Sequence, residues 1–434
     1  MEISLAKGRS IFAPKIRTER RLLILPQKAW QNKTRMASID KGGASRNLGL
    51  ALSGGGARAM AFHLGCLRAL HALGLLDRVK ALSTVSGGSV IGAAWIIHDG
   101  DFQSFERRIR TVLKTGLVKA AVRNLFSPLG VKVVGSFLTA VAVGVVLFLL
   151  RLMSSTLAWI IPPLRPLAIR VRDFRSPWRR AYTRSALLEA AMADLLFGQI
   201  KLPDLAGKPC RLIVNATELR TGSAFRYSPV ESGSWRWGAL LSNDTLLAHA
   251  VAVSAAYPML LPSFDEVHSF KKGGVVSEHR VALTDGGVYD NLGLGVFWPG
   301  RSPDVSLNVV SVESIICCSA GYGLKQDRPH SFMMARLVSA VGTIFERSQN
   351  HSMARLHELQ KAGVFKSFIL PYLGQLDHTL PKIPEGFVPR EEVHAYPTDF
   401  NAMSEHWINR LSLRGEQLTT MFAQHHFNET PTKQ

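Results

Sequence analysis

The feature that constrains this fold most strongly is a local pattern that occurs twice: an apolar strand, a glycine-rich turn and a helix. The first copy occupies residues 48–73 with its turn at 53–56, and the second occupies 79–98 with its turn at 86–88. This succession is typical of a parallel sheet with helices on its faces, so the sequence predicts an α/β fold. The strands expected are 48–52, 79–85, 211–216, 281–283 and 305–312, and the helices expected are 59–73, 90–98, 333–359 and about 401–424.

The first turn has the chemistry of an anion-binding loop. It comprises Gly54, Gly55 and Gly56, followed by Ala57 and Arg58, at the point where a strand passes into a helix. Glycines leave the backbone N–H groups uncovered, and these groups can hold an anion. The anion is either the pyrophosphate of a dinucleotide or the oxyanion of an acyl-transfer reaction. The dinucleotide fingerprint also requires an acidic residue after the second strand, and this chain has none there.

The second turn favours the oxyanion. Ser86 lies between Thr84 and the pair Gly87 and Gly88, in the strand-to-helix setting of a nucleophile elbow. A sharp turn of this kind lifts the serine hydroxyl out at the N-terminus of the helix, where the helix dipole favours developing negative charge. We therefore interpret Ser86 as a candidate nucleophile.

A hydroxyl nucleophile needs a base, and Asp285 is the natural candidate. It follows the expected strand 281–283 and precedes Gly286 and Gly287. A carboxylate at the end of a strand, freed by two glycines, can reach the turn of a neighbouring strand. We therefore expect Asp285 to accept the proton of Ser86.

Three motifs in this order resemble the patatin-like phospholipases. In that family a glycine-rich loop is the oxyanion hole, a Gly-x-Ser-x-Gly elbow carries the nucleophile, and an Asp-Gly-Gly or Asp-Gly-Ala motif carries the base of a Ser–Asp dyad. The resemblance implies a three-layer α/β/α sandwich with a mainly parallel central sheet, and it covers about 47–100 and 186–426. The site residues it implies are Ser86 and Asp285 for catalysis, Gly54, Gly55, Gly56, Ala57 and Arg58 for the oxyanion hole, Thr84, Gly87 and Gly88 for the elbow, and Gly286 and Gly287 for the base loop.

Two positions depart from the common family pattern. Thr84 replaces the first glycine of the elbow, and Ala59 replaces the glycine that usually follows the loop arginine. The second departure resembles a Gly-Gly-Gly-x-Arg-Ala subgroup, and residues 397–400 with the helix after them resemble bacterial members. A histidine triad is the competing mechanism. Its candidate histidines are His63, His249, His268 and His279.

Charge is concentrated in two parts of the chain. The 434 residues include 52 Lys or Arg and 32 Asp or Glu, a net charge of +20. Residues 1–50 hold eleven basic and three acidic residues, and residues 101–200 hold fifteen and five. Such an excess predicts an anionic partner, which is either nucleic acid or an anionic membrane surface.

An apolar insertion decides in favour of the membrane. Residues 133–150 carry no charge and are flanked by Lys132 and Arg151. As a helix they span about 27 Å, close to a hydrocarbon core of about 30 Å. Because this segment lies between Ser86 and Asp285 in the sequence, an odd number of crossings would separate the dyad. Residues 133–164 are therefore expected to form a re-entrant or tight hairpin, with an interfacial lid and a buried core helix as alternatives.

The sequence thus predicts a membrane-associated lipid acyl hydrolase, a phospholipase or lysophospholipase type of serine esterase, at the cytoplasmic face. Its expected partners are membrane fatty acyl esters, mainly phospholipids, and an anionic membrane surface, while nucleic acid is disfavoured. No metal or organic cofactor is expected, since the four cysteines lack metal-ligand spacing. An acyltransferase with the same dyad and a catalytically silent membrane scaffold are the alternatives. The predicted organisation is a basic arm 1–46, a catalytic domain 47–426 interrupted by a basic and hydrophobic insertion 101–185, and a tail 427–434.

Overall fold

One ten-stranded sheet organises the chain, in the order β10-β9-β1-β2-β3-β4-β5-β6-β7-β8. This computed structural model describes residues 47–174, 182–300, 306–321, 332–380, 383–394 and 396–427, so the predicted arm 1–46 and nearly all of the predicted tail lie outside the described residues. The strands are β1 (Leu48–Leu52), β2 (Val79–Thr84), β3 (Arg211–Glu218), β4 (Ser223–Tyr227), β5 (Gly233–Ser234), β6 (Gly238–Leu240), β7 (Phe264–Lys272), β8 (Val275–Asp285), β9 (Ser314–Cys318) and β10 (Ser367–Ile369).

The sheet has a parallel part and an antiparallel part that meet at β3. Strands β10, β9, β1, β2 and β3 are paired in parallel. Strands β3 to β8 form an antiparallel meander, and β8 returns to pair with β3. The centre of the parallel part is buried on both faces, as parallel sheets usually are.

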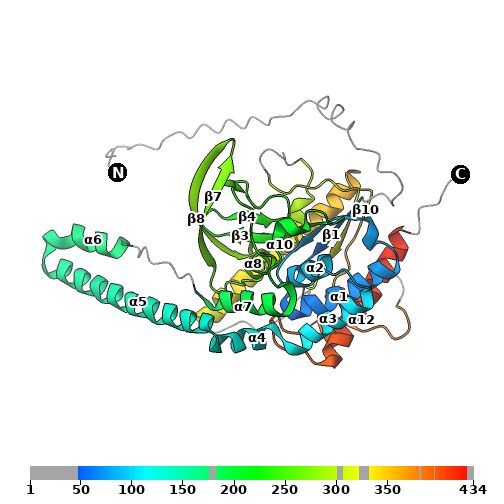
Figure 1. Ribbon diagram of the computed structural model, residues 1–434, viewed down its shortest axis with the longest axis horizontal. Coiled ribbons are helices and arrows are strands. Elements are labelled where there is room, and N and C mark those ends of the chain that lie inside the picture. Colours follow the sequence, from blue (N-terminus) through cyan, green and yellow to red (C-terminus); the bar gives the residue numbers. More distant parts are fainter. Residues whose placement is uncertain are drawn as a thin grey trace, which may run out of the picture. The chain divides into compact units, whose positions relative to one another are not determined.

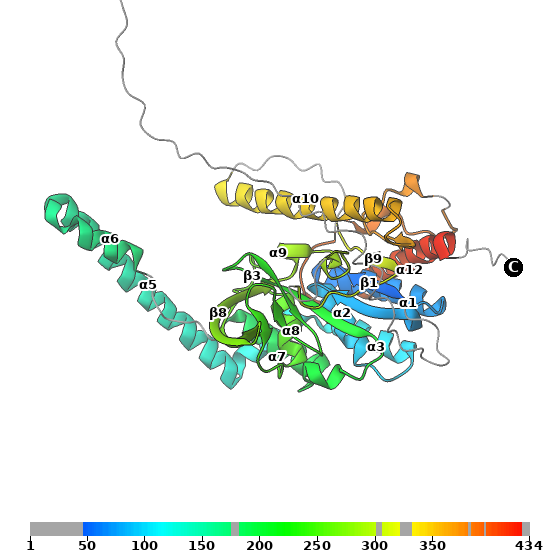
Figure 2. The same cartoon turned by 90° about the horizontal axis from the view of Figure 1, so that it is seen from above.

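Helices cover both faces of the parallel part, which confirms the predicted α/β class. Alternate side chains of β1 face opposite ways: Leu48, Leu50 and Leu52 belong to one hydrophobic core, whereas Ala51 belongs to the other. Figure 2 shows α1, α2 and α3 on one side of the sheet and α10 on the other. The main covering helices are α1 (Gly56–Ala72), α2 (Gly87–Ile96), α3 (Phe102–Thr115), α8 (Leu247–Ser254), α10 (Met333–Lys361) and α12 (Glu405–Phe427), with the short helices α9 (Gly287–Asp290) and α11 (Arg390–Val393) between them.

The predicted insertion begins and ends within the body of the fold. Its first helix, α3, places Phe105 and Ile109 in the main core. Helix α4 (Leu117–Arg123) follows it and packs against α7 (Arg184–Met192), the helix that leads back to the sheet. The part between α4 and α7 is the part whose side chains lie outside the core.

Helix α5 (Pro128–Ile160) carries the apolar segment and is 33 residues long. Ser127 caps its first turn, where its hydroxyl accepts a hydrogen bond from the N–H of Gly130, and Pro128 follows at the first helical position. Beyond a turn at 161–164, α6 (Arg165–Asp173) folds back beside α5, and a guanidinium N–H of Arg151 donates to the carbonyl of Phe174 at 2.8 Å (Figure 1). The two helices thus form a hairpin.

Solvent exposure distinguishes α5 from a core helix. Among the described residues it is the single helix long and apolar enough to cross a membrane, and only 6% of its most apolar window is buried. Apolar side chains point outward all round its axis, which is typical of a helix in lipid. The alternative of a buried core helix is therefore wrong for this segment.

The sequence misplaced one strand. No strand forms over the described residues 306–312, and β9 lies a few residues later at Ser314–Cys318. Asn308 adopts a left-handed φ of 60° there, and its side chain donates to the carbonyl of Glu231, so the chain turns before it enters the sheet. The apolar run at 315–318 is the segment buried on both faces.

Candidate active site

Strand β3 brings the two predicted catalytic residues to one edge of the sheet. In the parallel register Val214 pairs with Thr84, two residues before Ser86. In the antiparallel register Ala216 pairs with Asp285. Two neighbouring positions on one strand therefore set the separation between the elbow and the predicted base.

Ser86 occupies a strained turn. Its φ of 50° and ψ of −120° lie outside the regions that non-glycine residues prefer. The conformation places Ser86 at the start of α2, between β2 and that helix. Nearby glycines make room for the turn, because a Cβ at Gly87 would lie 2.1 Å from the carbonyl oxygen of Gly56.

A group of hydroxyls holds the elbow from behind. The backbone N–H of Ser86 donates to Oγ of Ser254 at 3.0 Å, and that hydroxyl donates to the carbonyl of Asn215 at 2.6 Å. Ser89 Oγ lies 2.9 Å from Ser254 Oγ and 3.0 Å from Thr84 Oγ1. All of these groups are buried, so each hydrogen bond fixes one geometry of the turn.

Thr84 fits the elbow for two reasons. Its hydroxyl donates to the carbonyl of Ile213 at 3.3 Å and receives the hydrogen bond of Ser89. Its methyl group faces Gly92, where an added Cβ would approach to 2.6 Å. The space that the elbow glycine usually provides is thus supplied here by a glycine in α2.

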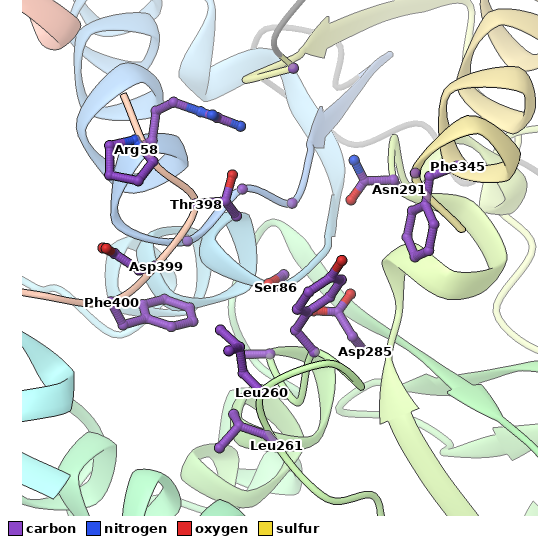
Figure 3. Close-up of a pocket in the computed structure, with 18 of the residues that line it drawn as sticks. Arg58, Ser86, Leu260, Leu261, Asp285, Asn291, Phe345, Thr398, Asp399 and Phe400 are labelled. Carbon is purple, nitrogen blue, oxygen red and sulfur yellow. The ribbon is translucent and has the colours of Figure 1, made fainter. Parts of the chain in front are cut away.

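Asp285 is buried at the end of β8 and faces Ser86. Its carboxylate accepts a hydrogen bond from the N–H of Gly287 at 2.6 Å, and the side chain of Ser86 lies beside it (Figure 3). Burial raises the pKa of Asp285 to about 7, although the N–H of Gly287 and the hydroxyl of Ser86 act in the opposite direction. A carboxyl group whose pKa lies near neutrality is suited to general-base chemistry.

The glycine loop lies against the elbow and the base loop. The N–H of Gly54 donates to the carbonyl of Asn291 at 3.1 Å, and the N–H of Ala57 donates to the carbonyl of Asp399 at 2.6 Å. In the part of the chain that the structure describes, the N–H groups of Gly55 and Gly56 have no acceptor. Both residues have positive φ, 141° and 60°, which favours glycine at these positions.

Arg58 lies at the start of α1 with its side chain buried at the edge of the loop. One guanidinium N–H donates to the carbonyl of Tyr396 at 2.8 Å. In Figure 3 Arg58 lies above Thr398 and Asp399, away from Ser86. The side chain therefore ties the glycine loop to the segment before α12.

The four candidate histidines of a triad lie elsewhere. His63 is fully buried beside the carbonyl of Cys318, and burial lowers its pKa to about 3. Although burial opposes it, hydrogen bonds to Glu189 and Glu266 raise the pKa of His249 to about 10. His268 binds Glu266, and His279 stacks on Trp237. None of the described residues that line the cavity at Ser86 is a histidine.

Ser86 and Asp285 line a cavity of about 1290 Å³. Figure 3 shows Leu260 and Leu261 below the two residues and Phe345 and Phe400 on either side. Gly54, Gly55, Gly56 and Arg58 also line this cavity. The other predicted site residues do not line it: Ala57, Thr84, Gly87, Gly88, Gly286 and Gly287. Among the described residues no cluster of three or more His, Cys, Asp or Glu side chains could hold a metal ion.

A family profile described as patatin-like phospholipase matches residues 50–298, more than half of the chain, with Ser86 and Asp285 both inside the match. The chain belongs to the patatin-like phospholipase family. The match includes the insertion, so this patatin-like chain carries its apolar hairpin within the family region. No curated protein matches the sequence.

Solved structures show the following likenesses. Human GIVD cytosolic phospholipase A2 is 14% identical with a TM-score of 0.48, and 88% of this chain covers 62% of that one. The same human protein with methyl γ-linolenyl fluorophosphonate inhibitor and terbium chloride is 16% identical with a TM-score of 0.46, covering 88% and 58%. VipD from Legionella pneumophila is 15% identical with a TM-score of 0.36, covering 88% and 68%. The chain therefore spans about three fifths of the length of the human protein.

Sequence reasoning missed several parts of the site. The supporting hydroxyls of Ser89 and Ser254 were not assigned a role, although the run 254–258 is recognisable as a helix end. The wall formed by α4 and α7 was missed altogether, because nothing local in those helices marks a cavity. Asn291, whose carbonyl holds the glycine loop, follows the base loop closely and could have been found from that position.

Proposed function

We propose that this patatin-like protein is a serine esterase that releases fatty acids from membrane lipids. The observation that carries the proposal is the position of the Ser86 side chain beside the buried carboxylate of Asp285 in a largely apolar cavity. The family of the chain supports the substrate class, since its members are described as phospholipase-like. No step requires a metal or an organic cofactor.

In the proposed reaction Asp285 accepts the proton of Ser86 as its oxygen attacks the carbonyl carbon of a fatty acyl ester. The tetrahedral oxyanion then lies on the N–H groups of Gly55 and Gly56, which have no other acceptor, at the dipole of α1. Asp285 returns the proton to the leaving alcohol. Water, deprotonated by the same carboxylate, then cleaves the acyl-enzyme and releases the fatty acid.

We further propose that the hairpin of α5 and α6 holds the enzyme on a membrane at its cytoplasmic face. α5 is exposed and apolar, and basic residues flank it. Arginine side chains bind phosphate groups well, and positive flanks favour the cytoplasmic side. Since α3 and α4 pack into the body, we assign membrane association to 128–174, within the insertion 101–185 of the proposed catalytic domain 47–426.

Two measurements on the full chain test the proposed chemistry. The purified protein is incubated with vesicles of phosphatidylcholine and phosphatidylglycerol, and the released fatty acid is measured by mass spectrometry. In parallel it is treated with a fluorophosphonate probe. Wild type should release fatty acid and bind the probe covalently, Ser86→Ala should do neither, and Asp285→Asn should lose about 10³-fold or more of the rate.

Matched controls come from an exposed loop. Ser242 and Asp244 form a surface hydrogen bond away from the cavity, so Ser242→Ala and Asp244→Asn should retain wild-type rates. A wild-type protein that neither binds the probe nor releases fatty acid would instead support a silent membrane scaffold. Hydrolysis that survives in Ser86→Ala would place the chemistry elsewhere.

A further inference from the structure

One wall of the cavity leads from Ser86 to the first turns of α5, which we call the foot of this helix. It is formed by three elements that adjoin the insertion: α4, the first turns of α5, and α7. Every side chain that these elements contribute, apart from one arginine, is apolar. The apolar residues of this wall are Val118, Ala121, Val122, Val133, Leu187 and Leu188, together with Leu125 in the turn between α4 and α5.

Apolar side chains next to this wall are also exposed on the outside of the molecule. Val122 is 54% exposed, and Phe126, in the turn between α4 and α5, is 87% exposed. Beyond Val133, the exposed surface of α5 is built from apolar side chains that include Val134 and Phe137. Monomeric proteins rarely expose apolar patches of this extent unless they bind a membrane or a partner.

The side of the cavity formed by α10 and the segment after β10 carries many more polar groups. There α10 contributes Glu346, Gln349 and Asn350 next to the apolar Phe345 and Met353. The segment after β10 contributes Gln375 and Thr379 next to Tyr372 and Leu376. The cavity is therefore almost wholly apolar towards α5 and mixed polar and apolar towards α10. This division matches a molecule with a hydrocarbon chain on one side of its ester and a polar group on the other.

Cations lie where the apolar wall meets the base of α5. Arg184 lines the cavity at the start of α7, and Lys132 directly precedes the uncharged segment of α5. An anionic phosphate at the surface of a bilayer is complementary to this arrangement. If lipid phosphates bind these cations, the acyl chains of the same lipids would lie beside the apolar surface of α5.

We propose that the wall of α4, α5 and α7 is the binding groove for the acyl chain of a membrane phospholipid, and that the chain enters it sideways from the bilayer along the foot of α5. The inference deepens the proposed function and rests on it. Hydrocarbon that passes from the bilayer onto an apolar wall is not exposed to water, so the cost of solvating each methylene is avoided. The volume of about 1290 Å³ exceeds the range of roughly 300–1,000 Å³ that is typical for small ligands.

The groove predicts that a substitution in it lowers the hydrolysis of long-chain esters more than that of short-chain esters. Val122 is exposed, so Val122→Trp can be made without disturbing the core, and its indole would narrow the groove. On p-nitrophenyl esters in detergent, Val122→Trp should lower kcat/KM for the sixteen-carbon ester at least about tenfold and change the four-carbon ester less than about twofold. The matched control is Val230→Trp, also exposed but remote from the cavity, which should preserve both values. An equal fall at both lengths, or no change at either, would overturn the groove.

A second experiment does not depend on turnover. Ser86→Ala is mixed with vesicles of phosphatidylcholine whose acyl chain ends in a photoreactive diazirine, and the crosslinked peptides are sequenced. Leu187 and Leu188 are 7% and 4% exposed, so bulk lipid reaches them only through the groove. Crosslinks at these two residues support the inference, whereas crosslinks confined to α10 or to the outer part of α5 overturn it.

The two experiments separate the inference from the proposed function. If no ester is hydrolysed but Leu187 and Leu188 are crosslinked, the esterase proposal fails and the acyl site stands. If hydrolysis depends on Ser86 but the crosslinks avoid this wall, the esterase stands and the groove is wrong.

Discussion

The side chain of Ser86 lies beside the carboxylate of Asp285, although the whole insertion separates the two residues in the sequence. Strand β3 accounts for this contact, because Val214 pairs with the end of β2 and Ala216 pairs with Asp285. Two hydrogen-bonding registers on one strand, one parallel and one antiparallel, thus assemble the proposed dyad.

The rate of ester hydrolysis should depend on the protonation of Asp285. Burial raises the pKa of this carboxyl group to about 7, and the proposed base must be ionised to accept a proton. We therefore expect kcat/KM to fall about tenfold for each pH unit below 7 and to level off above it. A pH–rate profile with a water-soluble short-chain ester measures this. A profile that is flat from pH 5 to 8 would contradict the assigned base.

The stability of the protein should reveal the same carboxyl group. Its pKa is raised in the folded state from 3.8 to about 7, so between these values the folded state binds more protons than the unfolded state. Stability is then lost as the pH rises through this window, by up to about 4 kcal/mol. Asp285→Asn removes this loss, so the unfolding temperature of the variant should rise relative to that of wild type as the pH increases from 4 to 8. A difference in unfolding temperature between the two proteins that is the same at every pH would exclude the raised pKa.

Ser254 should act as a positioning residue for the elbow. Ser254→Ala removes the acceptor for the N–H of Ser86 and leaves it unpaired in a buried site, at a cost of about 1–3 kcal/mol. We expect kcat to fall about 10- to 100-fold with little change in KM, because the hydroxyl of Ser86 is displaced while the cavity persists. Ser89→Ala keeps the contact between Ser254 and Ser86 and should have a smaller effect. A change in KM alone would argue against positioning.

The hairpin should be the membrane anchor. Replacing residues 134–174 by a flexible Gly-Ser linker removes the exposed apolar part of α5 and retains Val133 in the cavity wall. The shortened protein should move from the membrane fraction to the soluble fraction after centrifugation. It should retain hydrolysis of short-chain esters while losing activity on vesicles. An intact protein that is found in the soluble fraction would refute the proposed anchor.

Much of the fold could be predicted from local sequence. The first strand was predicted with its observed bounds, Leu48–Leu52, because an unbroken apolar run between turn residues has few alternatives. The strand expected at 305–312 was wrong over its described residues 306–312, because Asn308 stabilises a turn there and Val310 and Val312 pack against the core from outside the sheet. The antiparallel meander was harder to predict than the parallel part, because its strands are short or partly exposed.

The backbone amides of the glycine loop also show what local sequence could predict and what it could not. Local sequence marked the glycine loop, but it could not distinguish among the amides of Gly54, Gly55, Gly56 and Ala57. Among the described residues, Asn291 and Asp399 accept the hydrogen bonds of Gly54 and Ala57, so only the amides of Gly55 and Gly56 remain for the proposed oxyanion. Both acceptors come from parts of the chain remote from the loop in sequence.

Strand, turn and helix are set by residues a few positions apart, so the order of residues was enough to reveal the elbow, the glycine loop, the base loop and the apolar helix. Distances between these parts depend on strand pairing and on helix packing, which join residues hundreds of positions apart. Only the tertiary structure therefore decided that Ser86 faces Asp285, that Ser254 supports the elbow, and that the apolar wall of the cavity runs to the foot of α5.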